Sequence, residues 1–233
     1  MKFKGVIFDL YGTLVDMAPF KENECVWEMA YLLGAPQQEF ARKWFDSYKQ
    51  RELGEFATVK ACIEHICNAV GVASESSKIM KATKTLLDFT YQTLTPRADA
   101  IETLNLLKND GFKIGLISGC SMEVPLVWPS TLLASLLDAS IFSCLVGINK
   151  PDPRIYKEAC KIMKVAAEEC IYIGDGSSVE LRGALEVGMR PALIRVDYDR
   201  EYDTYRDIGD WKGTVISSLK EVKELLASNT VAS

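Results

Sequence analysis

The sequence predicts an α/β protein, a doubly wound parallel sheet with an inserted all-helical domain, on three observations. Short apolar runs alternate with amphipathic stretches through residues 94–233, which is typical of parallel strands joined by helices. Residues 19–93 show helical periodicity and no convincing strand. An apolar run at residues 3–9 precedes that block, so the insertion follows the first strand. We therefore expect a core domain at residues 1–16 and 94–233 and a helical domain at residues 17–93.

Four helices are expected in the inserted domain. Each of the first three is followed by a glycine or ends close to one, and glycine is a common helix stop. The four amphipathic blocks are residues 20–33, 37–53, 56–70 and 76–93.

The core elements follow from changes in periodicity and from turn residues. Strands are expected at residues 3–9, 113–118, 141–144, 170–174 and 191–196. Helices are expected at residues 98–109, around 130–137, from about 153, and at 177–187 and 218–227. The polar end of the chain, residues 228–233, is expected to fray.

The bulk composition fits a globular chain and argues against two classes of partner. Of the 233 residues, 48% are hydrophobic and 25% are charged, which suits one large domain or two smaller ones. The formal net charge of -5 provides no basic footprint for nucleic acid. No apolar stretch approaches the roughly 18 residues that are needed to span a bilayer. We expect no nucleic-acid partner and no membrane partner.

The cysteines and the start of the chain predict a cytoplasmic location. The first residues run directly into the first predicted strand and leave no room for a signal peptide. The seven cysteines are scattered and odd in number, which argues against a disulfide framework. Reduced thiols are expected at Cys25, Cys62, Cys67, Cys120, Cys144, Cys160 and Cys170.

Polar side chains of complementary kinds follow four of the predicted strands. Asp9 ends the first strand, and Thr13 comes shortly after it. Ser118 ends the second strand, Lys150 follows the third, and Asp175 follows the fourth. Ligand sites in open α/β sheets gather at the carboxyl ends of the strands. These side chains are therefore expected to converge on one site.

The charges in this set suggest covalent chemistry at a carboxylate. A carboxylate such as Asp9 can act as a nucleophile that forms an acyl-phosphate. A lysine and hydroxyl groups can hold the oxygens of a transferred phosphoryl group. Two carboxylates that converge without compensation raise each other's pKa, so a cation must lie beside Asp9 and Asp175. That cation is either the ammonium of Lys150 or a Mg²⁺ ion.

The four segments, in this order, resemble the four motifs of the haloacid dehalogenase-like (HAD) superfamily of hydrolases. The first motif corresponds to residues 8–16, and the later motifs correspond to Ser118, to Lys150-Pro151 and to Gly174-Asp175. The resemblance covers the whole chain. It implies a Rossmann-like core with a helical cap inserted after the first strand, and a small-molecule substrate.

The resemblance also implies roles for individual residues. Asp9 is expected to be the nucleophile, and Lys150 is expected to neutralise negative charge at the site. Thr13, Ser118 and Gly119 are expected to bind or orient the transferred group.

A metal site is implied by the same resemblance. A Mg²⁺ ion is expected on Asp9, on Asp175 and on the main-chain carbonyl of Tyr11. Glu180, further along the fourth motif, is expected to brace the lysine or the water shell of the metal.

One position departs from the pattern of the phosphatases in the superfamily. Their first motif is Asp-x-Asp, and the second aspartate protonates the leaving group and then activates water. In this chain the corresponding residue is Tyr11. A phenol with a pKa near 10 is a poor base at neutral pH. Because general acid–base catalysis contributes roughly 10²–10⁴-fold, phosphatase turnover is expected to be slow unless another group substitutes.

The same departure makes a 2-haloacid dehalogenase the alternative. Asp9-Leu10-Tyr11-Gly12-Thr13 resembles the first motif of those enzymes, which expel a halide and need no acid. Arg51 is a candidate for binding a substrate carboxylate, with a solvated cation near a helix end as the competing interpretation. Against this alternative, the dehalogenases work without metal and carry serine where this chain has Asp175.

We give more weight to the later motifs than to Tyr11, because an extra carboxylate weakens a metal-free nucleophile. The sequence therefore predicts Mg²⁺-dependent hydrolysis of a small phosphate ester through a phospho-aspartate intermediate. Dehalogenation through an aspartyl ester is the alternative, and a phosphometabolite-binding protein of low turnover is a further one. The chain is expected to be a monomer or a homodimer.

Overall fold

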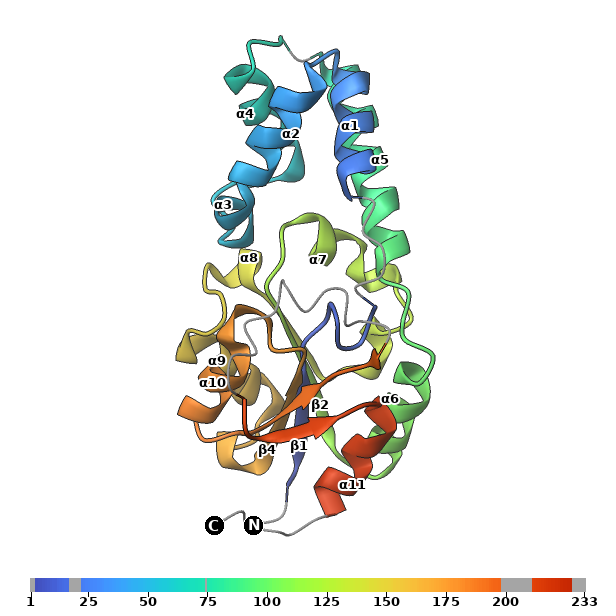
Figure 1. The fold of residues 1–233 in the computed structure, drawn as a ribbon, viewed down its shortest axis with the longest axis vertical. Helices are drawn as coiled ribbons and strands as arrows, with labels where there is room; N and C mark the ends of the chain where they lie inside the picture. The colour runs from blue at the N-terminus through green and yellow to red at the C-terminus, as the bar shows by residue number, and fades with distance from the viewer. Residues whose placement is uncertain (1–2, 17–21, 74, 198–210, 228–233) are drawn as a thin grey trace.

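The computed structural model describes residues 3–16, 22–73, 75–197 and 211–227, and its lower lobe is built on one six-stranded parallel sheet (Figure 1). The strand order is β3-β2-β1-β4-β5-β6. The strands are β1 (Gly5–Phe8), β2 (Lys113–Ser118), β3 (Ala139–Phe142), β4 (Cys170–Gly174), β5 (Arg190–Ile194) and β6 (Thr214–Ile216).

Strand β1 lies at the point where the strand order reverses, with β2 on one side and β4 on the other. Phe8 at the end of β1 is in register with Leu116 of β2 and with Ile173 of β4. The three strands therefore end at nearly the same level. Because all strands run parallel, the residues that follow them share one edge of the sheet, at the topological switch point where such folds bind ligands.

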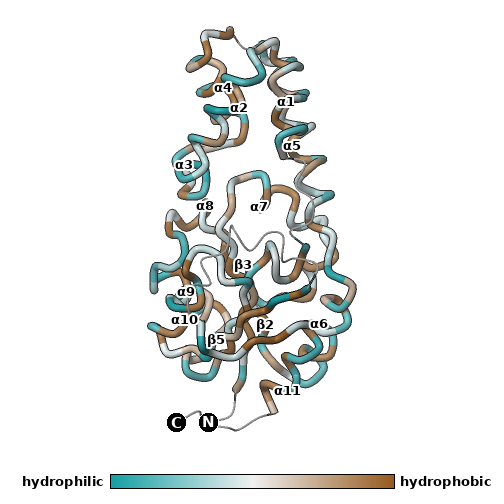
Figure 2. The backbone as a smooth tube through the Cα atoms, viewed as in Figure 1, coloured by the Kyte–Doolittle hydropathy of each residue, from teal (hydrophilic) through white to brown (hydrophobic). Residues whose placement is uncertain are grey.

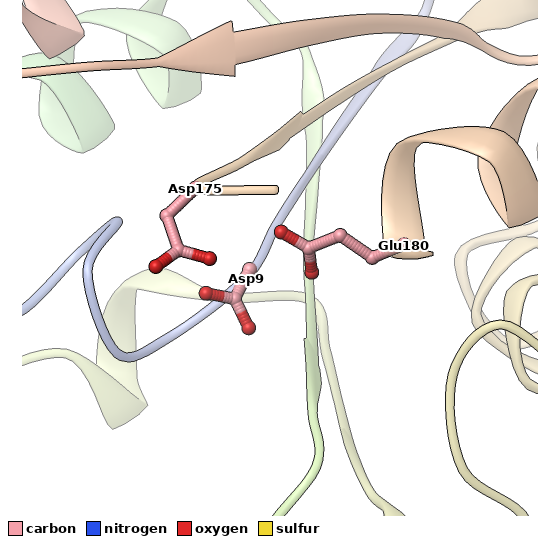
Figure 3. Close-up of side chains that lie close together, drawn as sticks. All are labelled: Asp9, Asp175 and Glu180. Carbon is pink, nitrogen blue, oxygen red and sulfur yellow. The ribbon is translucent and has the colours of Figure 1, made fainter. Parts of the chain in front are cut away.

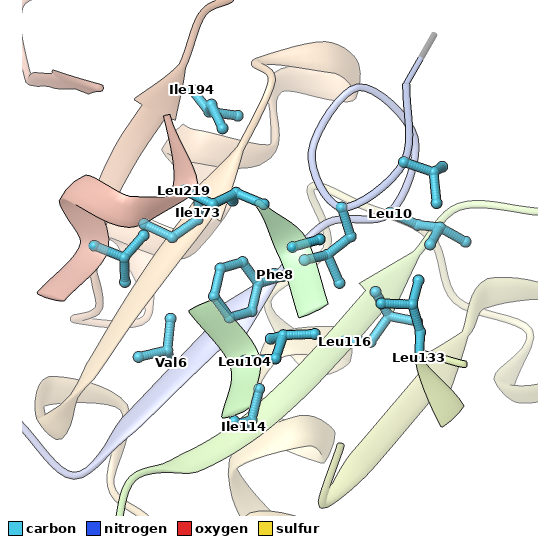
Figure 4. Close-up of a cluster of buried hydrophobic side chains, with 14 of the residues drawn as sticks. Val6, Phe8, Leu10, Leu104, Ile114, Leu116, Leu133, Ile173, Ile194 and Leu219 are labelled. Carbon is cyan, nitrogen blue, oxygen red and sulfur yellow. The ribbon is translucent and has the colours of Figure 1, made fainter. Parts of the chain in front are cut away.

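Both faces of the sheet are covered by helices. The side chains of β1 alternate between the faces, as the pleat of a strand requires. Val6 and Phe8 join a buried cluster with helix α6 (Ala100–Asn109), whereas Ile7 joins a second cluster with helix α9 (Pro153–Met163). Figure 4 shows the first cluster, in which Phe8 lies between the sheet and α6. Helices α10 (Glu180–Glu186) and α11 (Val222–Ala227) complete the two layers.

The upper lobe consists of helices alone and lies over the edge of the sheet where the strands end (Figure 1). We call this lobe, residues 22–93, the cap. It has a buried cluster of its own around Phe40, Trp44 and Ile63, separate from the clusters of the sheet. Its helices are α1 (Glu22–Leu33), α2 (Gln37–Asp46), α3 (Tyr48–Glu52), α4 (Val59–Ala69) and α5 (Ser76–Thr93).

Hydropathy follows this division of the molecule. Apolar residues run along the strands of the lower lobe, and hydrophilic residues occupy outer turns of its helices (Figure 2). All seven cysteines are free thiols and are buried, as expected for a reduced protein. Among the described residues, none of the helices is both long and apolar enough to cross a membrane.

The structure corrects the predicted helix over residues 37–53, which is interrupted at Ser47. The Ser47 hydroxyl donates to the carbonyl of Trp44 at 2.8 Å and so competes with the helical hydrogen bonds of the backbone. The result is two helices, α2 and α3, in place of one.

The predicted helix around residues 130–137 is also wrong. A short helix α7 (Glu123–Val127) precedes two 3₁₀ turns, at residues 128–130 and 134–136. The Thr131 hydroxyl donates to the carbonyl of Trp128 at 2.8 Å and accepts from the N–H of Ala134 at 3.3 Å, which favours turns over a continuous helix.

Two further differences concern strands. The predicted strand at 141–144 is shifted to β3, and its last residues begin a short helix α8 (Ser143–Val146) that ends at Gly147 with φ +66°. Strand β6 was not expected, because three residues at the edge of a sheet give too short a periodic signal.

The core packing predicts that truncation of two leucines of α6 will change the free energy of unfolding by very different amounts. Leu104 is fully buried against the sheet, whereas Leu106 is 44% exposed. We expect Leu104→Ala to lower the free energy of unfolding by about 2–5 kcal/mol, because it leaves a cavity in a packed core. Leu106→Ala is the matched control and should change it by less than about 0.5 kcal/mol. Urea unfolding followed by circular dichroism measures both, and equal effects would contradict this packing.

Candidate active site

The turn after β1 is built to hold a buried carboxylate. The N–H of Asp9 donates to the carbonyl of Ile173 at 2.8 Å, which fixes the strand end, and the side chain is only 4% exposed. The chain then reverses at Gly12, whose φ of +79° favours glycine. A side chain at Gly12 would collide with the carboxylate of Asp175. Glycine therefore permits both the turn and the close approach of the second aspartate.

Lys150 joins two carboxylates in this buried site. Its Nζ lies 2.5 Å from Oδ1 of Asp9 and 2.6 Å from Oε2 of Glu180. Burial alone would lower the pKa of Lys150, but the charges of Asp9 and Glu180 raise it well above its ordinary value. The ammonium of Lys150 is thus held in its charged form between the carboxyl groups of Asp9 and Glu180.

Glu180 is the anchor of that lysine. Besides Lys150, its Oε2 accepts from the hydroxyl of Tyr172 at 2.7 Å, and its Oε1 accepts from the N–H of Gly176 at 3.0 Å. Burial, opposed by Lys150 and assisted by Asp9, raises the pKa of Glu180 to about 8. Both oxygens are engaged by donors from the protein, so the geometry fits the bracing role expected of this residue.

Asp175 approaches from the end of β4 (Figure 3). Its Oδ1 accepts from the N–H of Ser177 at 2.9 Å. Oxygen atoms of Asp9, Asp175 and Glu180 lie within 4.8 Å of one another, and Figure 3 shows the other two carboxylates turned toward Asp9. Burial raises the pKa of Asp9; Lys150 lowers it and Asp175 raises it further.

This charge balance suits a divalent cation. Three buried carboxyl groups, those of Asp9, Asp175 and Glu180, lie within 4.8 Å of one another, and Lys150 pairs with two of them. Carboxylate oxygens are the ligands that Mg²⁺ prefers. Asp9, Asp175 and Glu180 are therefore the side chains that could hold such an ion.

The hydroxyl groups expected near the nucleophile are both buried. Thr13 donates to Oδ2 of Asp9 at 3.1 Å. Ser118 ends the neighbouring strand β2 and is buried. Gly119 follows it and lies against Asn149 and Glu52, which would leave little room for a side chain. Thr13 is therefore in contact with Asp9, while Ser118 and Gly119 line the adjoining strand end.

Tyr11 points from the same turn toward the cap. Its hydroxyl lies 3.3 Å from Oγ1 of Thr93, at the end of α5. It borders a chamber of about 590 Å³ between the cap and the core. The chamber walls are mainly apolar, with Phe45, Leu86 and Phe89 from the cap and Val124 from the core.

Arg51 lines the same chamber but is neither solvated nor at a free surface, so the interpretation as a solvated cation is wrong. The side chain is 4% exposed and stacks on Trp44, with its guanidinium carbon 4.2 Å from the ring centroid. It donates to Ser121 at 2.9 Å and pairs with Glu123 at 3.6 Å. Its charge is therefore already partly neutralised, and it joins the cap to the core.

Two residues of this region were missed by sequence reasoning. Glu52, at the end of α3, accepts a hydrogen bond from Nδ2 of Asn149 at 3.0 Å. Asn149 in turn accepts from the N–H of Lys150 at 2.9 Å. The position of Asn149 directly before the motif lysine was a usable signal, whereas nothing in the sequence indicated that Glu52 reaches the core.

Comparison with known proteins now identifies the family. The haloacid dehalogenase-like hydrolase profile matches residues 3–188. The chain therefore belongs to the haloacid dehalogenase-like hydrolases, and it is a hydrolase with the Rossmann-like fold and helical cap of that family.

Similar proteins include both dehalogenases and phosphatases. (S)-2-haloacid dehalogenase 4A of Burkholderia cepacia is 28% identical over 97% of this chain and 96% of its own length. Glyceraldehyde 3-phosphate phosphatase of Methanopyrus kandleri is 30% identical over 54% of each chain. The crystal structure of 2-haloacid dehalogenase from Pseudomonas syringae pv. Tomato DC3000 shares the fold, with a TM-score of 0.71, 24% identity and coverage of 97% of this chain and 98% of that one.

The buried lysine bridge predicts a large stability effect. Lys150→Met removes the ammonium between Asp9 and Glu180 and leaves buried carboxylates uncompensated. We expect the free energy of unfolding, measured in urea with a chelator present, to fall by about 3–5 kcal/mol. The control is Lys161→Met, whose side chain is 76% exposed and pairs with Glu158 at 3.3 Å. It should change stability by less than about 0.5 kcal/mol. A similar result for both variants would contradict the bridging role.

Proposed function

We propose that this hydrolase is a Mg²⁺-dependent phosphatase that acts on a small phosphate ester through a phospho-Asp9 intermediate. The observation that carries the proposal is the second carboxylate, Asp175, set against Gly12 and directed at Asp9. Without a metal this carboxylate opposes ionisation of the nucleophile. With Mg²⁺ bound, the ion would neutralise both aspartates and the phosphoryl oxygens.

The residues of the chain have distinct tasks in this reaction. Asp9 attacks phosphorus, and the ester oxygen leaves on the opposite side. Lys150 holds a phosphoryl oxygen and stabilises the charge that develops in the transition state. Glu180 and Tyr172 keep that ammonium in place. Thr13 orients the nucleophile through its hydrogen bond to Oδ2.

The chamber next to Tyr11 suits the organic part of the substrate. Its walls are mainly apolar and aromatic, and it opens between the cap and the strand ends. An apolar group placed there would be removed from water, which stabilises binding by about 25 cal/mol per Å². We therefore assign an ester with an apolar or aromatic organic group as the substrate class.

Dehalogenation is the second candidate, and Tyr11 is the observation that favours it. A halide leaves without a proton, so this reaction does not need the acid–base aspartate that Tyr11 replaces. (S)-2-haloacid dehalogenase 4A also aligns with 97% of the chain. In this reaction Asp9 would attack carbon instead of phosphorus.

Metal dependence separates the two candidates. We expect purified protein to release phosphate from p-nitrophenyl phosphate only when Mg²⁺ is present, and a chelator should abolish the release. Asp9→Asn should lose at least about 10³-fold in kcat, because the nucleophile is gone. The control is Asp110→Asn, an exposed residue at the end of α6 that pairs with Lys223. It should retain wild-type activity.

The opposite dependence on metal would change the proposed function. Release of halide from 2-chloropropionate in the presence of a chelator, with no release of phosphate, would replace the phosphatase by the dehalogenase. Failure of both assays, together with a higher melting temperature in the presence of a phosphorylated metabolite, would indicate a binding protein of low turnover.

The chamber wall gives a prediction for substrate preference. Phe89 lines the chamber, whereas Tyr91 on the same helix is 50% exposed. Phe89→Ala should raise KM for aryl phosphates by about 10-fold through lost apolar contact, and Tyr91→Ala should leave KM unchanged. Steady-state kinetics with phenyl phosphate measure both, and equal KM values in the two variants would place the organic group elsewhere.

A further inference from the structure

The proposed reaction lacks the usual acid–base carboxyl group at position 11. Tyr11 occupies the place where related phosphatases carry an aspartate, and a phenol is a poor base at neutral pH. An alkyl ester needs a proton on its leaving oxygen, and the phospho-enzyme needs a base to activate water. A carboxyl group outside the cluster of Asp175 and Glu180 must therefore supply and accept these protons.

Glu52 is such a group, and it comes from the cap. It ends helix α3, which packs against α8 of the core. Its Oε2 accepts from Asn149, and Asn149 accepts from the N–H of Lys150. Asn149 therefore links the carboxyl group of Glu52 to the backbone of Lys150, the lysine that bridges to Asp9.

The other oxygen of Glu52 faces the strand end beside the nucleophile. A Cβ placed on Gly119 would lie 3.2 Å from Oε1 of Glu52. Gly119 directly follows Ser118 at the end of β2, and it also lines the chamber beside Tyr11. Oε1 is thus close to Gly119, a residue that follows the strand end beside β1 and lines the chamber next to Tyr11.

The local fold keeps the end of α3 seated on the core. Gly54 has φ +70°, and a side chain there would collide with the carbonyl oxygen of Cys144. Arg51, the neighbour of Glu52, is fixed by Ser121 of the core. The carboxyl group is therefore held at the seam between cap and core by contacts on both sides of it.

The surroundings of Glu52 also favour the protonated form of its carboxyl group. Burial raises the pKa of Glu52, and this effect outweighs the hydrogen bonds from Tyr48 and Asn149 and the charges of Lys150 and Arg51, which lower it. Glu52 therefore retains its proton at a higher pH than a solvated glutamate does. A group that gains and loses a proton closer to neutrality is suited to general acid–base catalysis.

We propose that Glu52 is the general acid and base of the reaction and replaces the aspartate that Tyr11 has displaced. This inference rests on the phosphatase function proposed above. In the first step the bond between Asp9 and phosphorus forms, the bond from phosphorus to the ester oxygen breaks, and the Glu52 proton passes to that oxygen to give an alcohol. In the second step Glu52 takes a proton from water, and the water oxygen attacks phosphorus. The bond between Asp9 and phosphorus breaks and phosphate leaves, which restores the Asp9 carboxylate and the protonated Glu52.

The dependence on the leaving group tests this role. Glu52→Gln keeps the shape and cannot transfer the proton. For an alkyl phosphate such as propyl phosphate, kcat/KM should fall by about 100-fold or more. For p-nitrophenyl phosphate, whose leaving group is stable as an anion, kcat/KM should fall less than about 3-fold, because the expelled oxygen needs no proton. A burst of nitrophenol should precede the steady state, because water attack on phospho-Asp9 has lost its base.

Two further variants separate catalysis from positioning. Glu55→Gln changes an exposed glutamate three residues away, and it should match the wild type on both esters. Tyr11→Asp combined with E52Q restores a carboxyl group at the usual position, and it should recover at least about 10-fold of the lost kcat/KM on propyl phosphate. If E52Q fails to fold, Glu52→Asp, which retracts the carboxyl group by one methylene, takes its place in the same comparison.

Three outcomes would count against the proposal. Equal losses on both esters would make Glu52 a positioning residue that acts through Asn149, and unchanged kinetics on both would remove it from the reaction. In either case the wild-type phosphatase activity would stand. A wild-type protein that hydrolyses neither ester would overturn the phosphatase function itself, and the role of Glu52 with it.

Discussion

The ammonium of Lys150, shared between Asp9 and Glu180, is the interaction on which the site depends. It joins the end of the central strand to the start of α10 and to the loop after β3. Buried carboxylates are tolerated only when they are paired and hydrogen-bonded. The glycines at 12 and 176 and the hydroxyl of Tyr172 complete the arrangement, because they bring the anions close and supply the remaining donors.

The seam between cap and core is the second constraint. The cap has its own buried cluster, and it contacts the core through the packing of α5 on α7, through Met122 and through a few polar groups. Arg51 bonds to Ser121, Glu52 bonds to Asn149, and Gly54 allows the close approach to α8. These contacts close one side of an apolar chamber next to the nucleophile. Substrate selection and the proposed proton transfer therefore depend on the same few residues.

The chain combines two features that favour different reactions. Tyr11 in the first motif suits a reaction that needs no acid, whereas Asp175 in the fourth motif suits one that uses a metal. The two features meet in space, because Gly12 brings the turn of Tyr11 against Asp175. The charge of Asp175 bears on Asp9 directly, while the phenol of Tyr11 turns away toward Thr93. This geometry is why the metal carries more weight in the proposed function than the missing aspartate.

The sequence by itself determined the α/β fold, the bounds of the strands at 113–118 and 170–174, and the convergence of Asp9, Lys150 and Asp175. These features are local, since buried strands and the polar residues that end them are written in consecutive positions. Only the tertiary structure decided that Arg51 is buried and that Glu52 reaches Asn149. Those contacts join positions 70 residues apart for Arg51 and Ser121 and 97 apart for Glu52 and Asn149. They depend on the packing of cap on core, and no periodicity or spacing in one sequence encodes such a distance.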